Sequence, residues 1–466
     1  MRSPTAETLI PEVSELVQRR DFRAIRESLR HLPYADTADI LAELPPGDAA
    51  VAFRMLPHDD AAEVFAHLET DDQEALIGAL GEERALRVVE ELDPDDRARL
   101  IEELPATVST RLLDQLAPDT RRETQAILGY GTDQIGRLMT PDYVRVKPQW
   151  TVERALQHIR RYGQDAETVH WVYVVDHALR LVDDLFIRQL LLAEPTTAIA
   201  DLMDHQFVAL DANADREEAV IAFARYDRSA LPVVDARGRL VGIVTHDDVA
   251  DVAEEEATED FHKLAGVEAL TVPYLDTRPA QMIRKRGPWL ITLFTVQLAT
   301  IAVMASFETQ LESAVVLALF VPLIISTGGN TGTQTASMLV RAIALREVSI
   351  RNWSRVVSRE LVTGIALGIT LGLYALAITL GLTLTGMTDS ETPIRVGLAV
   401  STSVAAIVVW AVLSGSLLPL LLERLGFDPA SSSAPLVATL MDISGLLIYL
   451  AICTAALAGA ATTISA

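Results

Sequence analysis

The sequence has a single cysteine, Cys453, so no intrachain disulfide can form. It also lacks a Walker motif, a nucleophile elbow and a metal-ligand cluster, so we do not expect an enzyme. Residues 1–25 are charged and have no apolar core, and we therefore expect no signal peptide. All nine histidines precede Lys263, so the carboxyl-terminal part cannot offer the ligand sets that Zn²⁺ or Cu²⁺ prefers.

Charge is nearly absent from the carboxyl-terminal part. Before Trp289 the chain has 55 acidic and 32 basic residues, and from Trp289 onward it has only 9 and 7. The two parts carry net charges of −23 and −2, which together give the net charge of −25. An acidic soluble half therefore precedes a nearly uncharged half. The acidic half repels phosphates, which argues against a nucleic-acid partner, and it attracts divalent cations.

Apolar runs dominate the second half and predict membrane helices. The candidate spans are 289–307, 313–340, 361–386, 396–422 and 432–463. None contains lysine, arginine or histidine, and Asp442 is their one acidic residue. At about 1.5 Å per residue, Asp442 lies ~15 Å into the last span, near the bilayer midplane.

Two interpretations of Asp442 remain open, because an uncompensated carboxylate at this depth costs several kcal/mol. It is either protonated and hydrogen-bonded to a neighbouring helix, or its counter-ion is a cation that passes through. Its helix face is small and partly polar, which favours the second interpretation. The neighbours on that face are Ala438, Thr439, Gly445 and Leu446.

The second span carries an unusual polar run. Pro322 and several glycines weaken a helix there, and freed carbonyls need partners or water. Glycine and threonine also serve close helix packing, but packing alone does not call for both Asn330 and Gln334. We therefore expect Gly328, Asn330, Gln334 and, from the last span, Thr439 to line a pore.

Residues 1–130 form a helical repeat. Leucine recurs every twelve residues from Leu32 to Leu128 and is mostly followed by proline or aspartate. Each unit is therefore expected to be a helix of about seven or eight residues with an acidic cap, and the units to stack into a superhelix.

Residues 137–252 resemble a tandem pair of cystathionine-β-synthase (CBS) modules, small α/β units. In the second copy, strands are expected at 207–210, 230–235 and 240–244, and a helix at 217–226. That copy keeps Thr245 and Asp248, the pair that would hold the ribose of ATP or another adenine nucleotide. The first copy departs from the pattern at 181–188, which reads LVDDLFIR.

Residues 253–283 are expected to connect the modules to the membrane part, with a helix that has no glycine or proline until Gly266. Acidic residues crowd the start of this helix, and the helical repeat of residues 1–130 offers a second acidic surface. Two acidic surfaces cannot approach closely without cations between them, so together they could sense cations. The candidates for such a cytosolic cation sensor are Asp95, Asp96, Asp247, Asp251, Glu255, Glu256, Glu259 and Asp260.

Basic residues set the expected orientation. The connection 341–359 carries five arginines, whereas 308–312 has no basic residue and 387–395 has only Arg395. By the positive-inside rule, the soluble half and the basic connection face the cytoplasm of a cell-membrane protein, and the carboxyl terminus lies outside.

Several motifs identify a resemblance that covers nearly the whole chain. They are Pro322 with GGNTGTQ at 328–334, LGFDP at 425–429, PLVATLMD at 435–442 with GLLIY at 445–449, and EATEDFHK at 256–263. Together with the repeat and the CBS pair, they resemble the MgtE-type magnesium channels. The fold class is then a multidomain membrane protein with an α-superhelical domain, an α/β CBS pair and an all-α transmembrane domain, 284–466, of five helices.

The resemblance implies a homodimer in the lipid bilayer that imports Mg²⁺ through one pore on its two-fold axis. Asp442 would bind hydrated Mg²⁺, the helix around 253–275 would act as a plug, and cytosolic Mg²⁺ would close the pore through the acidic domains. Two alternatives stay open: a proton- or sodium-coupled divalent-cation transporter, and a membrane-tethered cation sensor that transports nothing.

Overall fold

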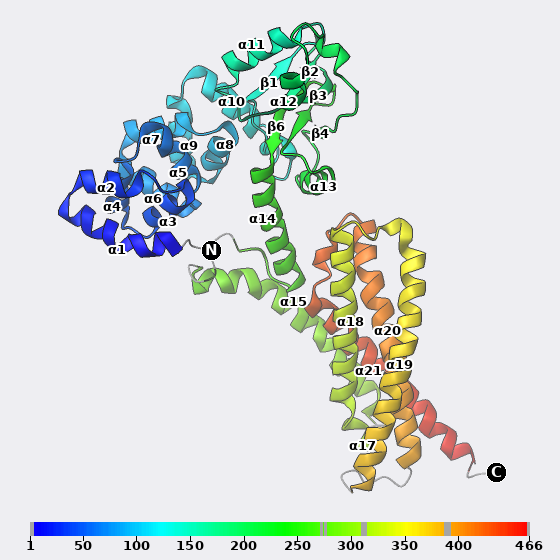
Figure 1. Ribbon diagram of the computed structural model, residues 1–466. Helices are drawn as coiled ribbons and strands as arrows, with labels where there is room; N and C mark the ends of the chain where they lie inside the picture. The colour runs from blue at the N-terminus through cyan, green and yellow to red at the C-terminus, as the bar shows by residue number, and fades with distance from the viewer. Residues whose placement is uncertain (1–3, 271–273, 275–276, 309–314, 386–392, 464–466) are drawn as a thin grey trace. The chain divides into compact units, whose positions relative to one another are not determined.

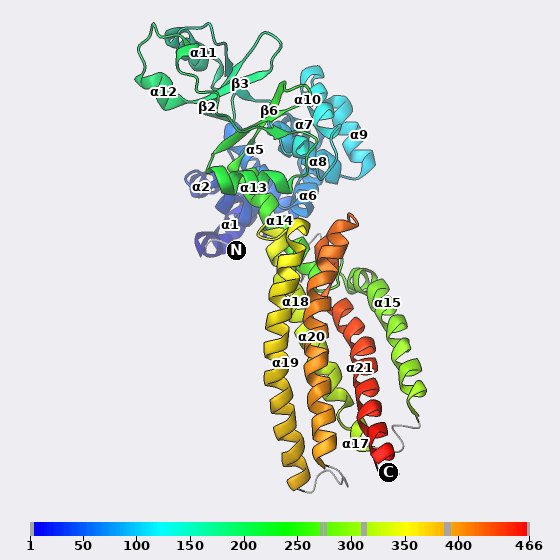
Figure 2. The same cartoon turned by 90° about the vertical axis from the view of Figure 1, so that its right-hand side faces the viewer.

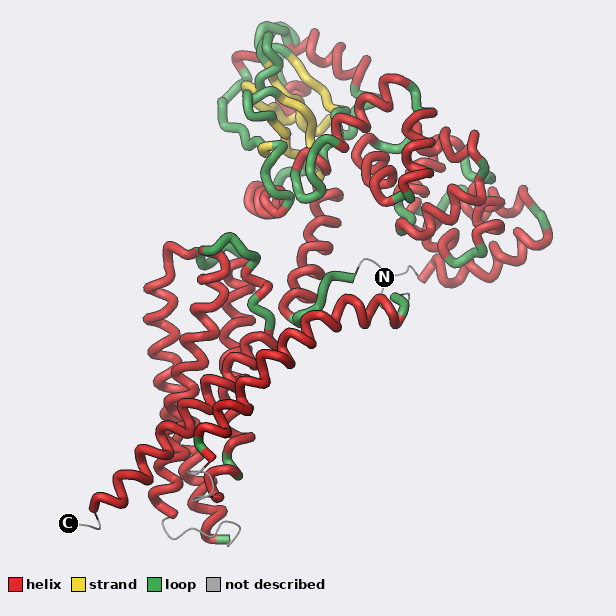
Figure 3. Tube along the Cα trace, turned by 180° about the vertical axis from the view of Figure 1, so that it is seen from behind, coloured by secondary structure: helices red, strands yellow, loops and turns green. Residues whose placement is uncertain are grey.

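The computed structural model describes residues 4–270, 274, 277–308, 315–385 and 393–463. The chain divides into two compact units, Met1–Glu254 and Glu255–Ala466. Within the described residues, strands occur only in the first unit, and the second is built from helices and their connections (Figure 3).

The first unit begins with the predicted array of short helices (Figure 1). They are α1 (Pro4–Arg19), α2 (Phe22–Leu29), α3 (Tyr34–Ala42), α4 (Pro46–Phe53), α5 (His58–Ala66), α6 (Thr70–Leu80), α7 (Glu82–Glu91), α8 (Pro94–Glu103), α9 (Ala106–Gln115) and α10 (Pro118–Leu128).

The periodic leucines form the core of this array, as the repeat predicts. Those from Leu44 to Leu116 are each at most 7% exposed, so every unit buries one leucine against its neighbours. Burial of such a side chain contributes about 2 kcal/mol. The helices α3 to α10 have 8 to 11 residues and are mostly longer than expected.

The predicted aspartate caps are largely absent, and proline stands at most helix starts instead. Only Asp21 caps its helix in the described array, by accepting a bond from the Ala24 amide at 3.1 Å. In most other helices of the array, proline stands at the cap or in the first turn, where no amide hydrogen is needed, as at Pro33 before α3 and Pro94 in α8. The helices α6 and α7 follow Glu69 and Gly81 instead. The acids lie in the first turns, where they complement the helix dipole.

Two small α/β modules follow, each with a three-stranded sheet in which the first two strands are parallel and the last two antiparallel. The first has η1 (Ile135–Arg137), β1 (Tyr143–Val146), α11 (Val152–Tyr162), β2 (Thr168–Val175), β3 (Leu181–Phe186) and α12 (Ile187–Leu192). The second has η2 (Ile199–Asp201), β4 (Leu210–Asp211), α13 (Glu217–Tyr226), β5 (Ala230–Val234), β6 (Leu240–Thr245) and the start of α14 (His246–Leu264).

The second module agrees closely with its prediction, since α13 has the expected bounds and β5 and β6 differ by one residue at an end. The strand expected at 207–210 is wrong in position, because only Leu210 and Asp211 pair with β5. The two modules share a core in which Tyr173 and Val175 of β2 meet Ala230 and Ile243 of the second sheet.

The connecting segment is helical only to Leu264, and the expectation of a helix as far as 275 fails there. Gly266 has φ +72°, a left-handed conformation that glycine adopts without strain and that ends a helix. The next helix, α15 (Pro279–Ser306), begins before the predicted span and includes the basic residues that precede it.

Four described helices are long and apolar enough to cross a membrane, in segments Pro279–Ser306, Ile350–Leu382, Ile394–Arg424 and Ala434–Ala456. They belong to α15, α19 (Trp353–Leu384), α20 (Pro393–Arg424) and α21 (Ala434–Thr463). The predicted second span is not among these four. Its described residues form α17 (Val315–Ala318) and α18 (Val321–Ala344), which are separated just before Pro322. The polar run makes α18 less apolar than the others. The short helices η3 (Ile350–Asn352) and η4 (Pro429–Ser431) precede α19 and α21.

Glycines allow these helices to pack closely (Figure 2 shows α19 beside α20). A Cβ at Gly368 of α19 would lie 2.8 Å from the Ala405 carbonyl oxygen of α20. A Cβ at Gly415 of α20 would lie 2.5 Å from the Gly332 carbonyl oxygen of α18. Contrary to the expectation of a weakened helix, α18 continues without a break through Gly328 and Gly332, because neighbouring helices pack against it.

Gly415→Ala tests this packing. The added methyl group must push α18 and α20 apart, so we expect a loss of ~1–3 kcal/mol in stability and a lower unfolding temperature in detergent. Gly381→Ala on α19 is the matched control, since a Cβ there would meet nothing within 4 Å. Equal unfolding temperatures for the two variants would contradict a tight α18–α20 contact.

Candidate functional site

Asp442 lies in α21, is half-buried and has a neutral partner. The side-chain amide of Gln297, in α15, donates from Nε2 to Asp442 Oδ2 at 2.9 Å. An ionised carboxylate only accepts hydrogen bonds, so this arrangement is compatible with the charged form, and Gln297 brings no positive charge to cancel it. The partner is an uncharged helix neighbour.

The helix face around Asp442 is more closely packed than the sequence suggested. Thr439 is 7% exposed, and its hydroxyl donates to the Pro435 carbonyl at 2.9 Å. Leu446 is 1% exposed and belongs to the core shared with α20. A Cβ at Gly445 would lie 3.7 Å from Ile407. The oxygens of Asp442 and Thr439 are therefore the polar groups of this face.

The polar run of α18 divides into two sides. Gly328 is buried, and a Cβ there would meet Ile407 of α20 at 3.0 Å and Met441 of α21 at 3.6 Å. Asn330 and Gln334 are exposed in the single chain. The Asn330 amide donates to Ser326 Oγ at 3.3 Å. Gly328 thus occupies a helix contact, whereas Asn330 and Gln334 present amides on an open side of α18.

A second set of carboxylates gathers within the first unit, where the start of α8 faces the start of α14. The charges of Asp93 and Asp247 interact, and so do those of Asp95 with Asp248 and Asp96 with Asp251. We call the six residues Asp93, Asp95, Asp96, Asp247, Asp248 and Asp251 the α8–α14 acidic cluster. The fold thereby brings together four predicted sensor residues, Asp95, Asp96, Asp247 and Asp251. It also adds Asp248, which the sequence suggested only as a nucleotide contact.

Burial and mutual repulsion raise the pKa values of four members of this cluster, Asp93, Asp95, Asp96 and Asp248. Burial, then the charges of Asp248 and Asp96, raise the pKa of Asp95 well above its usual range. Burial raises the pKa of Asp248 to about 6, with Asp247 and Asp96 adding to the effect. Glu167 lies close enough that burial and the charges of Asp93 and Asp248 raise its pKa to about 7. Within the described ranges, however, no three His, Cys, Asp or Glu residues are placed to hold one metal ion.

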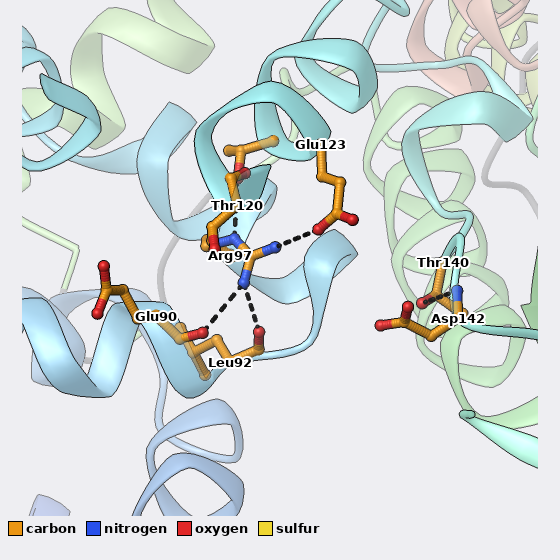
Figure 4. A network of polar contacts seen from close by, with 8 residues as sticks. Glu90, Leu92, Arg97, Thr120, Glu123, Thr140 and Asp142 are labelled. Atoms are coloured by element: carbon orange, nitrogen blue, oxygen red, sulfur yellow. Dashed lines mark hydrogen bonds and ion pairs between the residues drawn. The ribbon is translucent and has the colours of Figure 1, made fainter. Parts of the chain in front are cut away.

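Arg97 anchors α8 to α10 (Figure 4). The guanidinium is 3% exposed, donates from Nε to Thr124 Oγ1 at 2.8 Å and from Nη1 to the Leu92 carbonyl at 2.8 Å. Its Nη2 lies 3.8 Å from Glu123. The acids of α8 are therefore carried by a helix that is anchored on its buried side to α10.

The remaining sensor candidates lie farther along α14. Glu259 is 2.5 Å from Lys263, which also contacts Asp428, 2.7 Å away in the connection before α21. Burial, followed by the charge of Asp428, raises the pKa of Asp260. Glu255 and Glu256 lie on the same helix and have interactions of their own.

The predicted ribose contacts are adjacent, since Thr245 Oγ1 donates to Asp248 Oδ2 at 2.5 Å. In the first module, the sequence at 181–188 departs from the CBS pattern because two of its aspartates have structural partners. Asp183 is fully buried and accepts bonds from the amides of Asp204 and His205 at 2.9 and 3.0 Å. Asp184 is 3.3 Å from Arg228.

Sequence reasoning missed Gln297, Asp93, Glu167 and Lys263. An amide within an otherwise apolar span was the available signal for Gln297, because such a group needs a partner in a membrane. Asp93 and Lys263 lie in patterns that the sequence shows, but these patterns do not name their partners, and Glu167 has no such pattern.

The pKa values predict a pH dependence of stability. The folded-state pKa values of about 7 for Glu167 and about 6 for Asp248 exceed the ordinary 4.5 and 3.8. Protonation therefore favours the folded state, and its contribution is present below about pH 4 and lost as pH rises through about 6–7. Without divalent cations, the unfolding temperature should fall from about pH 5 to 8. A Glu167→Gln, Asp248→Asn variant should flatten this fall, whereas exposed Glu153→Gln should not, and equal slopes in all three would contradict the assignment.

Family comparisons agree with this organisation. A family described as MgtE, divalent cation transporter, matches residues 321–452, the MgtE intracellular N domain matches 32–133, and CBS domains match 135–185 and 199–255. A protein of Thermus thermophilus named magnesium transporter MgtE is 43% identical over 333 residues, 72% of each chain. A protein of the same name from Bacillus subtilis is 33% identical over 334 residues, also 72% of each chain.

A solved structure matches the soluble part. The cytosolic domain of the Mg²⁺ channel MgtE in complex with ATP is 40% identical, with a TM-score of 0.51, and the match covers 52% of this chain and 100% of that one. The three family matches occur in the expected order, and relatives match this chain over 72% of their length at up to 43% identity. This chain therefore belongs to the MgtE family of divalent cation transporters.

Proposed function

We propose that this protein conducts Mg²⁺ across a membrane along a path that passes Asp442. The observation that carries the proposal is the Asp442 carboxylate, which lies in an apolar helix and is bound by a neutral amide. Its negative charge is thus available to a passing cation. The magnesium transporters from Thermus thermophilus and Bacillus subtilis support the choice of ion.

The donor chemistry also favours Mg²⁺. This ion prefers oxygen ligands in an octahedral shell and gives up its water reluctantly. Asp442, with Asn330 and Gln334 as predicted lining residues, offers oxygens that can accept bonds from its water. No histidine follows His262, and Cys453 is buried beside Ser403, so a path for Zn²⁺ or Cu²⁺ is disfavoured.

The functional unit in this proposal is a homodimer. One carboxylate per chain provides only half the charge of a divalent cation, and a two-fold axis near Asp442 doubles it. α15 also leaves large apolar side chains exposed in the single chain, including Leu290, Phe294 and Ile301. Lipid and a second copy together would cover such a surface.

We further propose that cytosolic Mg²⁺ closes the path by binding the soluble acids, with the soluble half in the cytoplasm and the carboxyl terminus outside. In the α8–α14 acidic cluster, burial and then mutual repulsion raise the pKa values of Asp95 and Asp248, so a bound cation would lower the free energy of bringing these helices together. Mg²⁺ then favours the compact state by its greater affinity for that state. Glu255, Glu256, Glu259 and Asp260 would extend this response along α14.

Adenine nucleotide is a proposed ligand of the second CBS module. The cytosolic structure of the related channel contains ATP, and here Thr245 and Asp248 lie together as a ribose contact requires. The first module offers Asp183 to its own backbone instead, so nucleotide contacts are expected from the second copy.

Asp442→Asn tests the path. The isosteric change removes the charge, so Mg²⁺ flux into proteoliposomes should fall to less than about a tenth of the wild-type value, while the dimer still forms. Thr370→Val is the control, since that exposed hydroxyl of α19 donates only to the Ala366 carbonyl. Normal flux through folded Asp442→Asn would refute the path. Flux that vanishes when pH and sodium gradients are clamped would instead favour a coupled transporter.

Neutralising Asp95, Asp96 and Asp248 as asparagines tests the gate. With fewer charges to attract the ion, inhibition should need roughly fivefold more cytosolic Mg²⁺, and deletion of residues 1–130 should relieve it without removing conduction. Patch-clamp open probability against cytosolic Mg²⁺ measures both effects. Exposed Asp119→Asn serves as the control, and identical inhibition curves in all variants would show that the gate lies elsewhere.

A further inference from the structure

Gln297 is the one amide side chain in the apolar segment 289–306 of α15. The other polar side chains that follow Trp289 in this helix are threonines and a serine, which can return their hydroxyl hydrogen to the helix backbone, as Thr295 does to Ile291 at 2.8 Å. One hydrogen bond to the backbone of its own helix does not use all the polar atoms of a carboxamide, because it has two donor hydrogens and an acceptor oxygen. Its place in a membrane helix therefore calls for a partner on another element.

That partner is Asp442. α15 packs beside α21 (Figure 2), and Gln297 is half-buried where the Nε2–Oδ2 bond of 2.9 Å crosses between them. The bond uses one carboxylate oxygen and one amide hydrogen. Within the described part of the chain, neither Asp442 Oδ1 nor Gln297 Oε1 makes a hydrogen bond with protein. Two acceptor oxygens, one charged and one neutral, thus remain on this hydrogen-bonded pair without a donor from the described residues.

A neutral partner has a different consequence from a basic one. Lysine or arginine at this position would fix the carboxylate but cancel its charge, and a passing cation would meet a neutral pair. The amide fixes the carboxylate through a hydrogen bond to a charged acceptor and leaves the full charge. It also takes up one lone pair of Oδ2 and holds Nε2 2.9 Å from that oxygen, which disfavours contact of both carboxylate oxygens with a bare cation.

We propose that Gln297 is a positioning residue that makes the path selective for hydrated Mg²⁺ over Ca²⁺. Asp442 Oδ1 and Gln297 Oε1 accept bonds from the water shell that Mg²⁺ retains. Ca²⁺ sheds water readily and favours direct, often bidentate, carboxylate contact, which the Gln297 bond opposes. This inference rests on the proposed Mg²⁺ conduction past Asp442.

The test compares Mg²⁺ and Ca²⁺ uptake into proteoliposomes, with block by cobalt(III) hexaammine, a fixed-shell analogue of hydrated Mg²⁺. Gln297→Met keeps the length of the side chain but removes the amide. A hydrogen bond to a charged group is lost, so the Mg²⁺-to-Ca²⁺ flux ratio should fall about tenfold and block should weaken. Thr295→Val, on the exposed side of the same helix, should change neither quantity.

A reciprocal exchange separates direct contact from a general packing effect. Gln297→Asn shortens one partner and Asp442→Glu lengthens the other, so each alone should lose selectivity, and the double variant should recover it. This exchange also decides the matter if Gln297→Met does not fold.

Two failures are distinguishable. Wild-type protein that carries no Mg²⁺ would overturn the proposed function. If the wild-type protein conducts and conduction depends on Asp442, two results would overturn the role of Gln297 alone. One is an unchanged flux ratio and an unchanged block in Gln297→Met. The other is a double variant that does not recover selectivity.

Discussion

A carboxylate inside an apolar helix bundle constrains everything around it. Asp442 must find hydrogen-bond donors without losing its charge, and the structure meets this need with the amide of Gln297 at 2.9 Å. The rest of the face is formed by small or buried side chains, so the polar groups are confined to a narrow part of α21. The electrostatic free energy of a cation there depends on the oxygens that remain available after this bond has formed.

Close helix packing makes that confinement possible. Gly368 and Gly415 let the backbones of α18, α19 and α20 approach until a single methyl group would collide with a carbonyl oxygen, that of Ala405 or of Gly332. Helices in a membrane gain no hydrophobic free energy from contact with one another, so dispersion and close backbone approach must hold them. The glycines of the polar run on α18 therefore serve the bundle, whereas its amides at Asn330 and Gln334 stay exposed.

Patterns local in sequence predicted much of this structure. The twelve-residue leucine period, the bounds of α13 and the apolar segments were visible because periodicity and turn residues act over short stretches. The partner of Asp442 was not, since Gln297 lies 145 residues away and an amide alone does not name its partner. The capping aspartates were overestimated, because Pro33 occupies the cap position of α3 and has no side-chain oxygen, and Asp93 at the cap of α8 makes no capping bond.

The acids of this chain occur in three electrostatic settings that respond differently to cations. Asp428 lies 2.7 Å from Lys263, and an added cation must compete with that ammonium. Asp442 has a neutral donor, so its charge is kept but its orientation is fixed. Burial first, and then the charges of facing carboxylates, raise the pKa values of Asp95 and Asp248, so a cation that approaches them relieves repulsion as well as gaining attraction. Sensing is therefore expected where carboxylates face one another, and conduction where one carboxylate is held by an uncharged group.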